Sequence, residues 1–339
     1  MKTGFLSGLP LIVLGGVLQG TFALPMKYAR RWNHENIWLV FAFTGLVLFP
    51  WLLAVMTIPA LADVYRFTPA ATTVAILGFG AGWGIGATLT GIGLRLLGIS
   101  LGLGIILGLS ASIGSLVPFL VFHPEQLFSS RGYFYLAGTL TMFVGIGLIA
   151  KAGSLRERLA QEQTSGLRKS FAPGLAACVA SGVLSSALNF SFAFGAPMVD
   201  RAKYFGAPDV WASNAVTAAA TTGGFVANAI YCTVMLRRNK SLSQYTAAGT
   251  GSHWLYGLTM GAFWYGGLTL YALGIANAGS FGAVLGWPLL MGVIVVVSNL
   301  VGWLTGEWNE ASSQAKTSLF TGCAVILIAL GILGGAQRG

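Results

Sequence analysis

The chain has 339 residues, of which 55% are hydrophobic and only 8% are charged, and its mean hydropathy is +0.76. Soluble domains carry about 25% charged residues, so this chain cannot cover a water-facing surface and must be solvated by lipid. Its formal net charge of +10 comes from lysines and arginines scattered over short connectors between apolar runs, which argues against a nucleic-acid-binding protein.

Ten apolar segments are long enough to cross about 30 Å of hydrocarbon, which takes about 20 helical residues each. Backbone groups in hydrocarbon need internal hydrogen-bond partners, so these segments are predicted to be helices. In chain order they are Leu6–Leu24, Ile37–Ile58, Thr72–Leu94, Ile99–Phe122, Tyr133–Ala150, Phe171–Phe194, Val210–Leu236, Trp254–Ala276, Phe281–Leu304 and Ser318–Leu333. We therefore expect an all-α integral membrane protein with ten transmembrane helices.

The connectors predict an orientation. If the N-terminus lies outside, 13 of the 19 lysines and arginines fall in connectors on the inner side. The positive-inside rule then places both termini in the periplasm. The longest connector, Lys151–Ser170, is predicted to contain a short cytoplasmic surface helix, because Ser154-Leu155-Arg156-Glu157 has the form of a capping box.

The sequence repeats itself weakly. Gly80-Ala81-Gly82-Trp83 recurs 181 residues later as Gly261-Ala262-Phe263-Trp264, and Gly16-Val17-Leu18 recurs as Gly182-Val183-Leu184. The repeat predicts two five-helix halves, residues 1–150 and 171–339, joined by a linker at 151–170. Because five is odd, the halves must lie in opposite orientations, and such inverted repeats are typical of secondary transporters that work by alternating access.

Further motifs keep their order along nearly the whole chain. They are Pro25-Met26-Lys27 with Arg31-Trp32, Gly82-Trp83-Gly84-Ile85-Gly86, then Gly91, Arg95, Leu97-Gly98 and Gly102-Leu103-Gly104-Ile105, the linker Gly153-Ser154-Leu155-Arg156-Glu157-Arg158, Trp264-Tyr265 and Glu307-Trp308-Asn309. With these motifs the chain resembles the L-rhamnose–proton symporter family of the drug/metabolite transporter superfamily. The resemblance implies that fold, and proton-coupled uptake of a deoxy-sugar across the inner membrane.

A neutral sugar is bound by groups that hydrogen-bond its hydroxyls and by aromatic faces beneath its C–H surface. Amides inside membrane helices suit this role, although each can equally form a bond between helices. The aromatic candidates include two tryptophans at equivalent repeat positions, which lie deep in their spans, whereas Trp38, Trp51 and Trp308 suit an interfacial belt. The predicted substrate-binding residues are Gln19, Trp83, Asn189, Asn214, Asn228, Trp264, Tyr265 and Asn299.

Proton coupling has fewer candidates, because all nine carboxylates fall in connectors or at span ends. His253, at the start of the eighth span, is the predicted titrating group, with an interfacial histidine as the alternative. Lys27, Arg95 and Glu307 sit at span ends and are candidates for gating pairs, or else ordinary inside-facing charges.

Two other functions stay open on the residues alone. One is an uncoupled or sodium-coupled carrier of another small polar metabolite, and the other is an intramembrane enzyme, which the three scattered histidines and the lack of a deep acid disfavour. Cys178, Cys232 and Cys323 have no ligand-like spacing, so neither a metal nor another cofactor is expected. The expected partners are the sugar, protons or sodium, the lipid bilayer, and a second copy in a possible homodimer through the glycine-bearing fifth and tenth spans.

Overall fold

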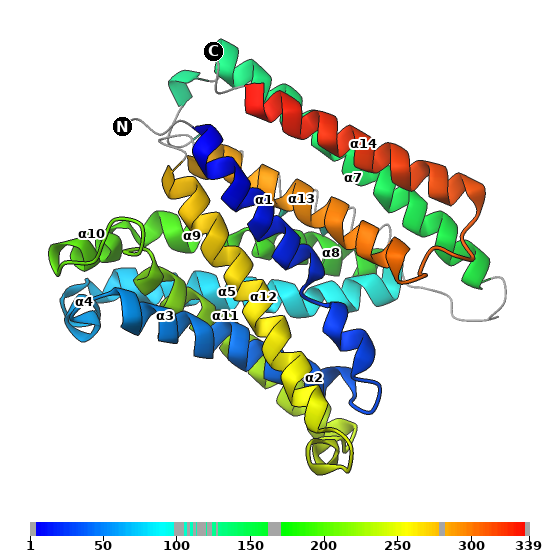
Figure 1. The fold of residues 1–339 in the computed structure, drawn as a ribbon, viewed down its shortest axis with the longest axis horizontal. Coiled ribbons are helices and arrows are strands. Elements are labelled where there is room, and N and C mark those ends of the chain that lie inside the picture. Colours follow the sequence, from blue (N-terminus) through cyan, green and yellow to red (C-terminus); the bar gives the residue numbers. More distant parts are fainter. Residues whose placement is uncertain are drawn as a thin grey trace. The chain divides into compact units, whose positions relative to one another are not determined.

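A computed structural model describes residues 5–97, 105, 106, 109, 110, 113, 120, 124–126, 128–161, 171–277 and 282–335, and every regular element within these residues is helical (Figure 1). The α-helices are α1 (Phe5–Thr21), α2 (His34–Phe43), α3 (Phe49–Thr57), α4 (Leu61–Phe67), α5 (Ala70–Leu97), α7 (Ser130–Gln161), α8 (Phe171–Ser185), α9 (Ala187–Phe194), α10 (Ala196–Tyr204), α11 (Asn214–Arg238), α12 (Gly251–Asn277), α13 (Gly282–Leu304) and α14 (Ser313–Gly335). Four short turns of other helix types are η1 (Leu24–Tyr28), η2 (Thr44–Leu48), η3 (Pro124–Gln126) and η4 (Leu242–Thr246).

Within the described residues, eight helical segments are long and apolar enough to cross a membrane. They are Gly8–Tyr28, His34–Thr57, Ala70–Gly93, Gly132–Arg156, Ala172–Tyr204, Asn214–Arg238, Gly286–Leu304 and Ser313–Leu333. This confirms an all-α, multi-pass membrane protein. The eight do not include α12, which covers the predicted eighth span but is rich in glycine, tyrosine and tryptophan, and the predicted fourth span, Ile99–Phe122, lies mostly outside the described residues.

The second span is not a uniform α-helix. Its middle, η2, is a π-helical turn followed at once by Pro50 in α3. Proline has no N–H and removes one backbone hydrogen bond from the turn before it, which is a usual cause of such local widening. The hydroxyl of Thr44 donates to the carbonyl of Val40 at 2.9 Å and to that of Gly257 in α12 at 3.2 Å, so this turn is also where α12 packs on the second span.

The predicted surface helix beginning at Ser154 is wrong. Helix α7 runs without a break from Ser130 to Gln161, so Ser154 lies inside it. The helix continues past its membrane-spanning part because Ala152 and Leu155 pack against the buried Trp308 and Ala315. Tertiary packing of this kind contributes more to helix stability than a local capping sequence, so the helix continues through Ser154.

The chain folds into two compact units. The first contains Met1–Gly20, Leu89–Ser186 and Gly274–Gly339, and the second contains Thr21–Thr88 and Ala187–Leu273. Each unit draws on both halves of the predicted repeat. The division of the sequence at 150 and 171 therefore stays a prediction about repeats and not about compact units.

In the first unit, α7 and α14 lie side by side along much of their length (Figure 1). Glycines allow the close approach: a Cβ atom on Gly322 would lie 2.6 Å from Cγ1 of Ile149 and 2.9 Å from the carbonyl oxygen of Gly145. The fifth and tenth predicted spans thus use Gly145 and Gly322 to pack on each other within one chain. A bulky residue at Gly145 would disturb this packing and would not report on a homodimer.

In the second unit, α5 packs closely on α11, and α2 with η2 packs on α12. Gly80 and Gly84 of α5 contact the backbone of Ala220 and Gly224, and Gly261 of α12 contacts Thr44. The four-residue spacing of Gly80 and Gly84 is typical of close packing between membrane helices. Small residues let these helices approach, and this approach places the aromatic side chains described next.

Candidate functional site

Two tryptophans meet in the second unit. The rings of Trp83 in α5 and Trp264 in α12 have centroids 5.4 Å apart and planes inclined by 32°. Trp264 is 8% exposed, and Phe41 of α2 meets its ring edge-on at 6.3 Å. The two residues that the repeat predicted to be equivalent are therefore in contact. Together they present aromatic surface of the kind that can pack on a sugar.

Glycine in α11 sets the position of Trp83. A Cβ atom on Gly224 would lie 2.7 Å from Cε3 of Trp83, which is closer than side-chain atoms pack. The ring therefore rests directly on the backbone of α11. Gly80 keeps α5 against Ala220 one turn away, so the ring and its supporting helix are held together.

Asn228 anchors a further tryptophan. Its Oδ1 accepts a 2.9 Å hydrogen bond from Nε1 of Trp38, while its Nδ2 donates at 2.9 Å to the carbonyl of Gly224. Trp38 in turn packs edge-on against Phe41 at 4.9 Å. Both polar groups of Asn228 thus have protein partners, which supports a positioning role. Trp38, assigned from the sequence to an interfacial belt, belongs to this aromatic cluster.

The other predicted ligands fall in both units. Asn214, at the first residue of α11, donates to the hydroxyl of Thr57 at 2.9 Å, and Asn299 in α13 donates to the carbonyl of Val295 one turn earlier at 2.8 Å. Asn189 is half-buried in α9 of the second unit, and Gln19 is buried in α1 of the first. Tyr265 is 5% exposed, and its hydroxyl has no hydrogen-bond partner within 3.5 Å in the part of the chain that is described.

His253 lies where two connectors touch. It is 6% exposed at the start of α12, and its Nε2 accepts a 3.4 Å hydrogen bond from the backbone N–H of Arg31. Its Nδ1 lies 3.3 Å from the hydroxyl of Ser252, and its ring meets Trp32 edge-on at 5.5 Å. The histidine therefore joins the α1–α2 connector to the α11–α12 connector within the second unit.

The predicted gating residues fall in both units. Lys27 is exposed in η1 of the second unit, and the side chain of Arg95 lies outside the described residues. In the first unit, Glu307 is 3.5 Å from Nη1 of Arg156, whose guanidinium also lies 4.9 Å from the ring centre of Trp308. Trp308 is 4% exposed, so its expected role in a lipid-facing belt is wrong, because α7 covers it.

Sequence reasoning placed Glu35 in a connector and assigned it no role. The structure leaves it 4% exposed at the start of α2, where its Oε1 accepts hydrogen bonds from Ser241 Oγ at 2.7 Å and Asn239 Nδ2 at 2.9 Å. Gln244 adds a reciprocal pair with Asn33. The signal in the sequence is that short polar runs precede α2 and follow α11, yet nothing in the sequence says that these runs meet.

The connectors at the other end of this unit make an apolar contact. Helix α4 packs on α10 through Val64, Met198 and Ala202, each of which has no exposed surface. The hydroxyl of Tyr65 donates to the carbonyl of Ala215 at 2.7 Å, and burial raises the pKa of this phenol. The second unit is therefore closed by hydrogen bonds at one end and by apolar packing at the other.

Comparison with known proteins gives these contacts a context. The model of the L-rhamnose-proton symport protein family (RhaT) matches residues 1–337. The chain belongs to this family. An L-rhamnose-proton symporter of Klebsiella pneumoniae is 29% identical over 331 residues, covering 95% of both chains, and one of Escherichia coli is 28% identical over 343 residues, covering 98% of both. A solved crystal structure of a protein shares the fold, with a TM-score of 0.59 and 18% identity over 98% of each chain.

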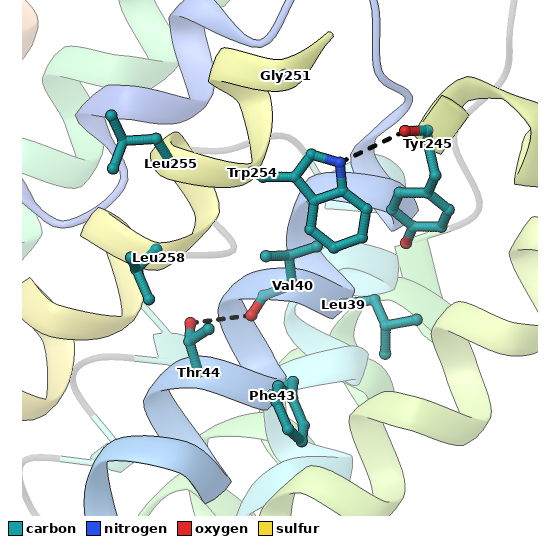
Figure 2. Close-up of a pocket in the computed structure, with 9 residues that line it drawn as sticks. All are labelled: Leu39, Val40, Phe43, Thr44, Tyr245, Gly251, Trp254, Leu255 and Leu258. Atoms are coloured by element: carbon teal, nitrogen blue, oxygen red, sulfur yellow. Dashed lines mark hydrogen bonds between the residues drawn. The ribbon is translucent and has the colours of Figure 1, made fainter. Parts of the chain in front are cut away.

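Membership of the RhaT family makes this chain a membrane transporter and not an enzyme. Its second unit also has a pocket of about 710 Å³, which Figure 2 shows between α2 and the first turns of α12. The polar side chains on its wall already have partners: Thr44 donates to Val40, Tyr245 Oη donates to Asn36 at 3.1 Å, and Trp254 Nε1 donates to Tyr245 at 3.4 Å. A sugar needs hydrogen bonds that this wall does not offer, so the pocket is not suited to the substrate.

Proposed function

We propose that the chain carries L-rhamnose or a closely related deoxy-sugar, together with protons, across the bacterial inner membrane. The observation that carries this proposal is the family match over residues 1–337, because it spans both units and every predicted helix. Relatives that are called L-rhamnose-proton symporters cover the chain to the same extent. The names of these relatives support the proposed substrate and coupling ion, and the geometry of the second unit supports the proposed site.

The proposed sugar-binding surface in the second unit is the tryptophan pair with Tyr265. Trp83 and Trp264 supply aromatic faces for the apolar side of the ring, and the unpartnered hydroxyl of Tyr265 supplies a hydrogen-bonding group beside Trp264. A 6-deoxy-sugar suits this surface because its methyl group enlarges its apolar side. Asn189, Asn214, Gln19 and Asn299 remain proposed amide ligands, and Asn228 is proposed to position Trp38.

Alternating access is the proposed mechanism, with ten helices in two inverted repeats. The chain passes between the two units after Gly20, Thr88, Ser186 and Leu273. The first and third passages fall four residues after Gly16 and Gly182, the glycines that the repeat pairs. Because the chain crosses between the units at equivalent positions of the repeat, these positions support a mechanism in which the two units move about corresponding residues.

The connectors of the second unit support the same proposal. The connector before α2 contacts the one after α11, and the connector after α3 contacts the helix before α11. An inverted repeat relates these two contacts, since each joins a connector of one half to the opposite connector of the other half. The hydrogen-bonded contact also brings together Arg30, Arg31, Arg237 and Arg238 at one end of the unit. This concentration of positive charge supports a cytoplasmic location for that end and periplasmic termini.

His253 is the proposed proton-coupling residue. Its Nε2 can accept from Arg31 N–H only while the imidazole is neutral, because both ring nitrogens are donors once it is protonated. Protonation would therefore break this contact and place a positive charge beside Arg31. Glu35 is a weaker candidate, since its hydrogen-bond donors stabilise the charged carboxylate and oppose proton uptake.

The test of the site is L-rhamnose binding to the purified chain, followed by intrinsic tryptophan fluorescence. Wild type should show a saturable change that Trp83→Phe and Trp264→Phe reduce and that the matched control Trp303→Phe, in the first unit, leaves intact. Gln19→Ala and Asn189→Ala should raise the dissociation constant. A full fluorescence change in both Trp83→Phe and Trp264→Phe would remove this assignment.

A further inference from the structure

The pocket of Figure 2 has features that the proposed transport function leaves unused. It lies in the second unit, and exposed apolar side chains form its wall: Phe43 is 48%, Trp254 47%, Leu255 59% and Leu258 38% exposed. The parts of α2 and α12 that line it belong to this unit, and α2 begins the membrane-spanning segment His34–Thr57. Its volume of about 710 Å³ falls in the range of about 300–1,000 Å³ that is usual for ligand pockets.

One end of the pocket has aromatic residues of the kind found at a membrane–water interface, and the pocket extends from there along apolar side chains. Gly251 and Tyr245 line one end, the mouth, next to the hydrogen-bonded connectors, and Leu258 lies two turns of α12 further along. Seven helical residues rise by about 10 Å. Trp254 and Tyr245 stand at the mouth, where Figure 2 shows the indole N–H turned to the Tyr245 carbonyl, as aromatic residues at a membrane surface commonly are.

The mouth is strongly basic. One guanidinium N–H of Arg31 donates at 2.9 Å to Ala248, three residues before Gly251, and the exposed guanidinium has five N–H donors in all. The two connectors at this end and the last turn of α11 also carry four other exposed cations: Arg30, Arg237, Arg238 and Lys240. Their one carboxylate, Glu35, is buried and bound by its own donors. Cations therefore outnumber carboxylates within these segments, and a neighbouring anion is attracted to this end of the unit.

We propose that this groove binds an anionic phospholipid, with one acyl chain between α2 and α12 and the phosphate at Arg31. The apolar wall, with its polar groups already bonded to backbone, suits a hydrocarbon chain and excludes a sugar. The basic mouth favours an anionic over a zwitterionic headgroup, by about fivefold for each cation engaged. Each methylene buried in the groove contributes on the order of fourfold to binding. The groove is thus a lipid site apart from the tryptophan pair.

The test is native mass spectrometry of the full chain in detergent, titrated in parallel with phosphatidylglycerol and phosphatidylcholine. Wild type should retain phosphatidylglycerol more strongly. Arg31→Gln, which keeps a donor for Ala248, should weaken phosphatidylglycerol about fivefold and leave phosphatidylcholine unchanged, whereas Arg201→Gln, a matched exposed cation in α10, should change neither. Leu255→Trp, which fills the groove, should weaken both lipids about tenfold, and Val234→Trp, at a similarly exposed position in α11, should not.

Three outcomes would overturn the proposal. Equal retention of the two lipids by wild type would rule out a preference for the anionic headgroup. If Leu255→Trp retained both lipids as strongly as wild type, the acyl chain would not lie in the groove. A dimer in the spectra that Leu255→Trp converts to monomer, with lipid retention unchanged, would assign the groove to a second copy of the chain.

Discussion

Replacing Gly224 by alanine would move Trp83 without substituting any residue of the proposed sugar-binding site. The new Cβ would lie 2.7 Å from Cε3 and 2.8 Å from Cζ3 of the indole, whereas carbon atoms pack best at about 3.5–4.0 Å. The ring must therefore shift by about 1 Å. Helix α5 cannot retreat instead without opening the contacts of Gly80 with Ala220, so the strain falls on the ring.

A shift of this size takes Trp83 off Trp264. Such an aromatic pair is worth about 0.5–1.5 kcal/mol beyond the area it buries, which corresponds to about 2- to 12-fold in an equilibrium constant. We expect Gly224→Ala to raise the KM for uptake of labelled L-rhamnose in proteoliposomes by roughly three- to tenfold, while the protein still folds. The matched control is Gly78→Ala in α5, since a Cβ there meets nothing within 4 Å and should leave KM unchanged.

Thermal unfolding of the same variants separates the site from the fold. Overpacking costs about 1–3 kcal/mol, so Gly224→Ala should unfold a few degrees below Gly78→Ala. If the two variants had the same KM as wild type while Gly224→Ala was visibly destabilised, the strain would lie elsewhere and Trp83 would not belong to the sugar-binding surface.

Four further predictions concern stability. Glu35→Gln should lower the free energy of unfolding by about 2 kcal/mol, because hydrogen bonds to a charged acceptor are worth more than those to an amide; equal melting of this variant and the exposed control Arg238→Gln would contradict that role. Asn228→Leu should cost about 1–3 kcal/mol by leaving the Trp38 N–H without an acceptor, and Trp38→Phe in the same chain should recover part of the loss, whereas additive costs would show that the two residues are not coupled. Gly322→Ala should destabilise the α7–α14 contact by about 1–3 kcal/mol, whereas Gly331→Ala, whose Cβ meets nothing within 4 Å, should leave the melting temperature unchanged. Equal melting temperatures of the two variants would show that the α7–α14 contact adjusts to the added methyl group. Burial raises the pKa of Tyr245 to about 12, so the stability it contributes is complete below about pH 10 and is lost as the pH rises towards 12, and Tyr245→Phe should melt with a shallower pH dependence than wild type between pH 9 and 11.5.

Composition and the length of the apolar runs were enough to predict an all-α membrane protein. Runs of about 20 mostly apolar residues predict membrane helices, and eight helical segments long and apolar enough to cross a membrane lie within the described residues. The repeat also singled out Trp83 and Trp264, because matching positions in two related halves tend to occupy equivalent places, and these two rings are in contact. Gly80 and Gly84 are four residues apart, a spacing typical of close helix packing, and both contact the backbone of α11.

What the sequence could not supply was long-range pairing. Glu35 and Ser241 are 206 residues apart, and nothing local announces that a carboxylate at a helix start will be buried by the far connector. The position of Trp308 near a span end likewise suggested a lipid-facing belt, because the sequence does not show that α7 extends over it. A local capping signal at Ser154 misled for the same reason, since the packing that extends α7 comes from residues more than 150 positions away.

Uptake of labelled L-rhamnose into proteoliposomes containing only this chain tests the central claim most directly. An inward proton gradient should drive accumulation above the external concentration, with no comparable effect of a sodium gradient, and His253→Gln should retain downhill exchange while losing this accumulation. Equal uptake with and without the proton gradient, or accumulation driven by sodium alone, would contradict proton-coupled transport by this chain.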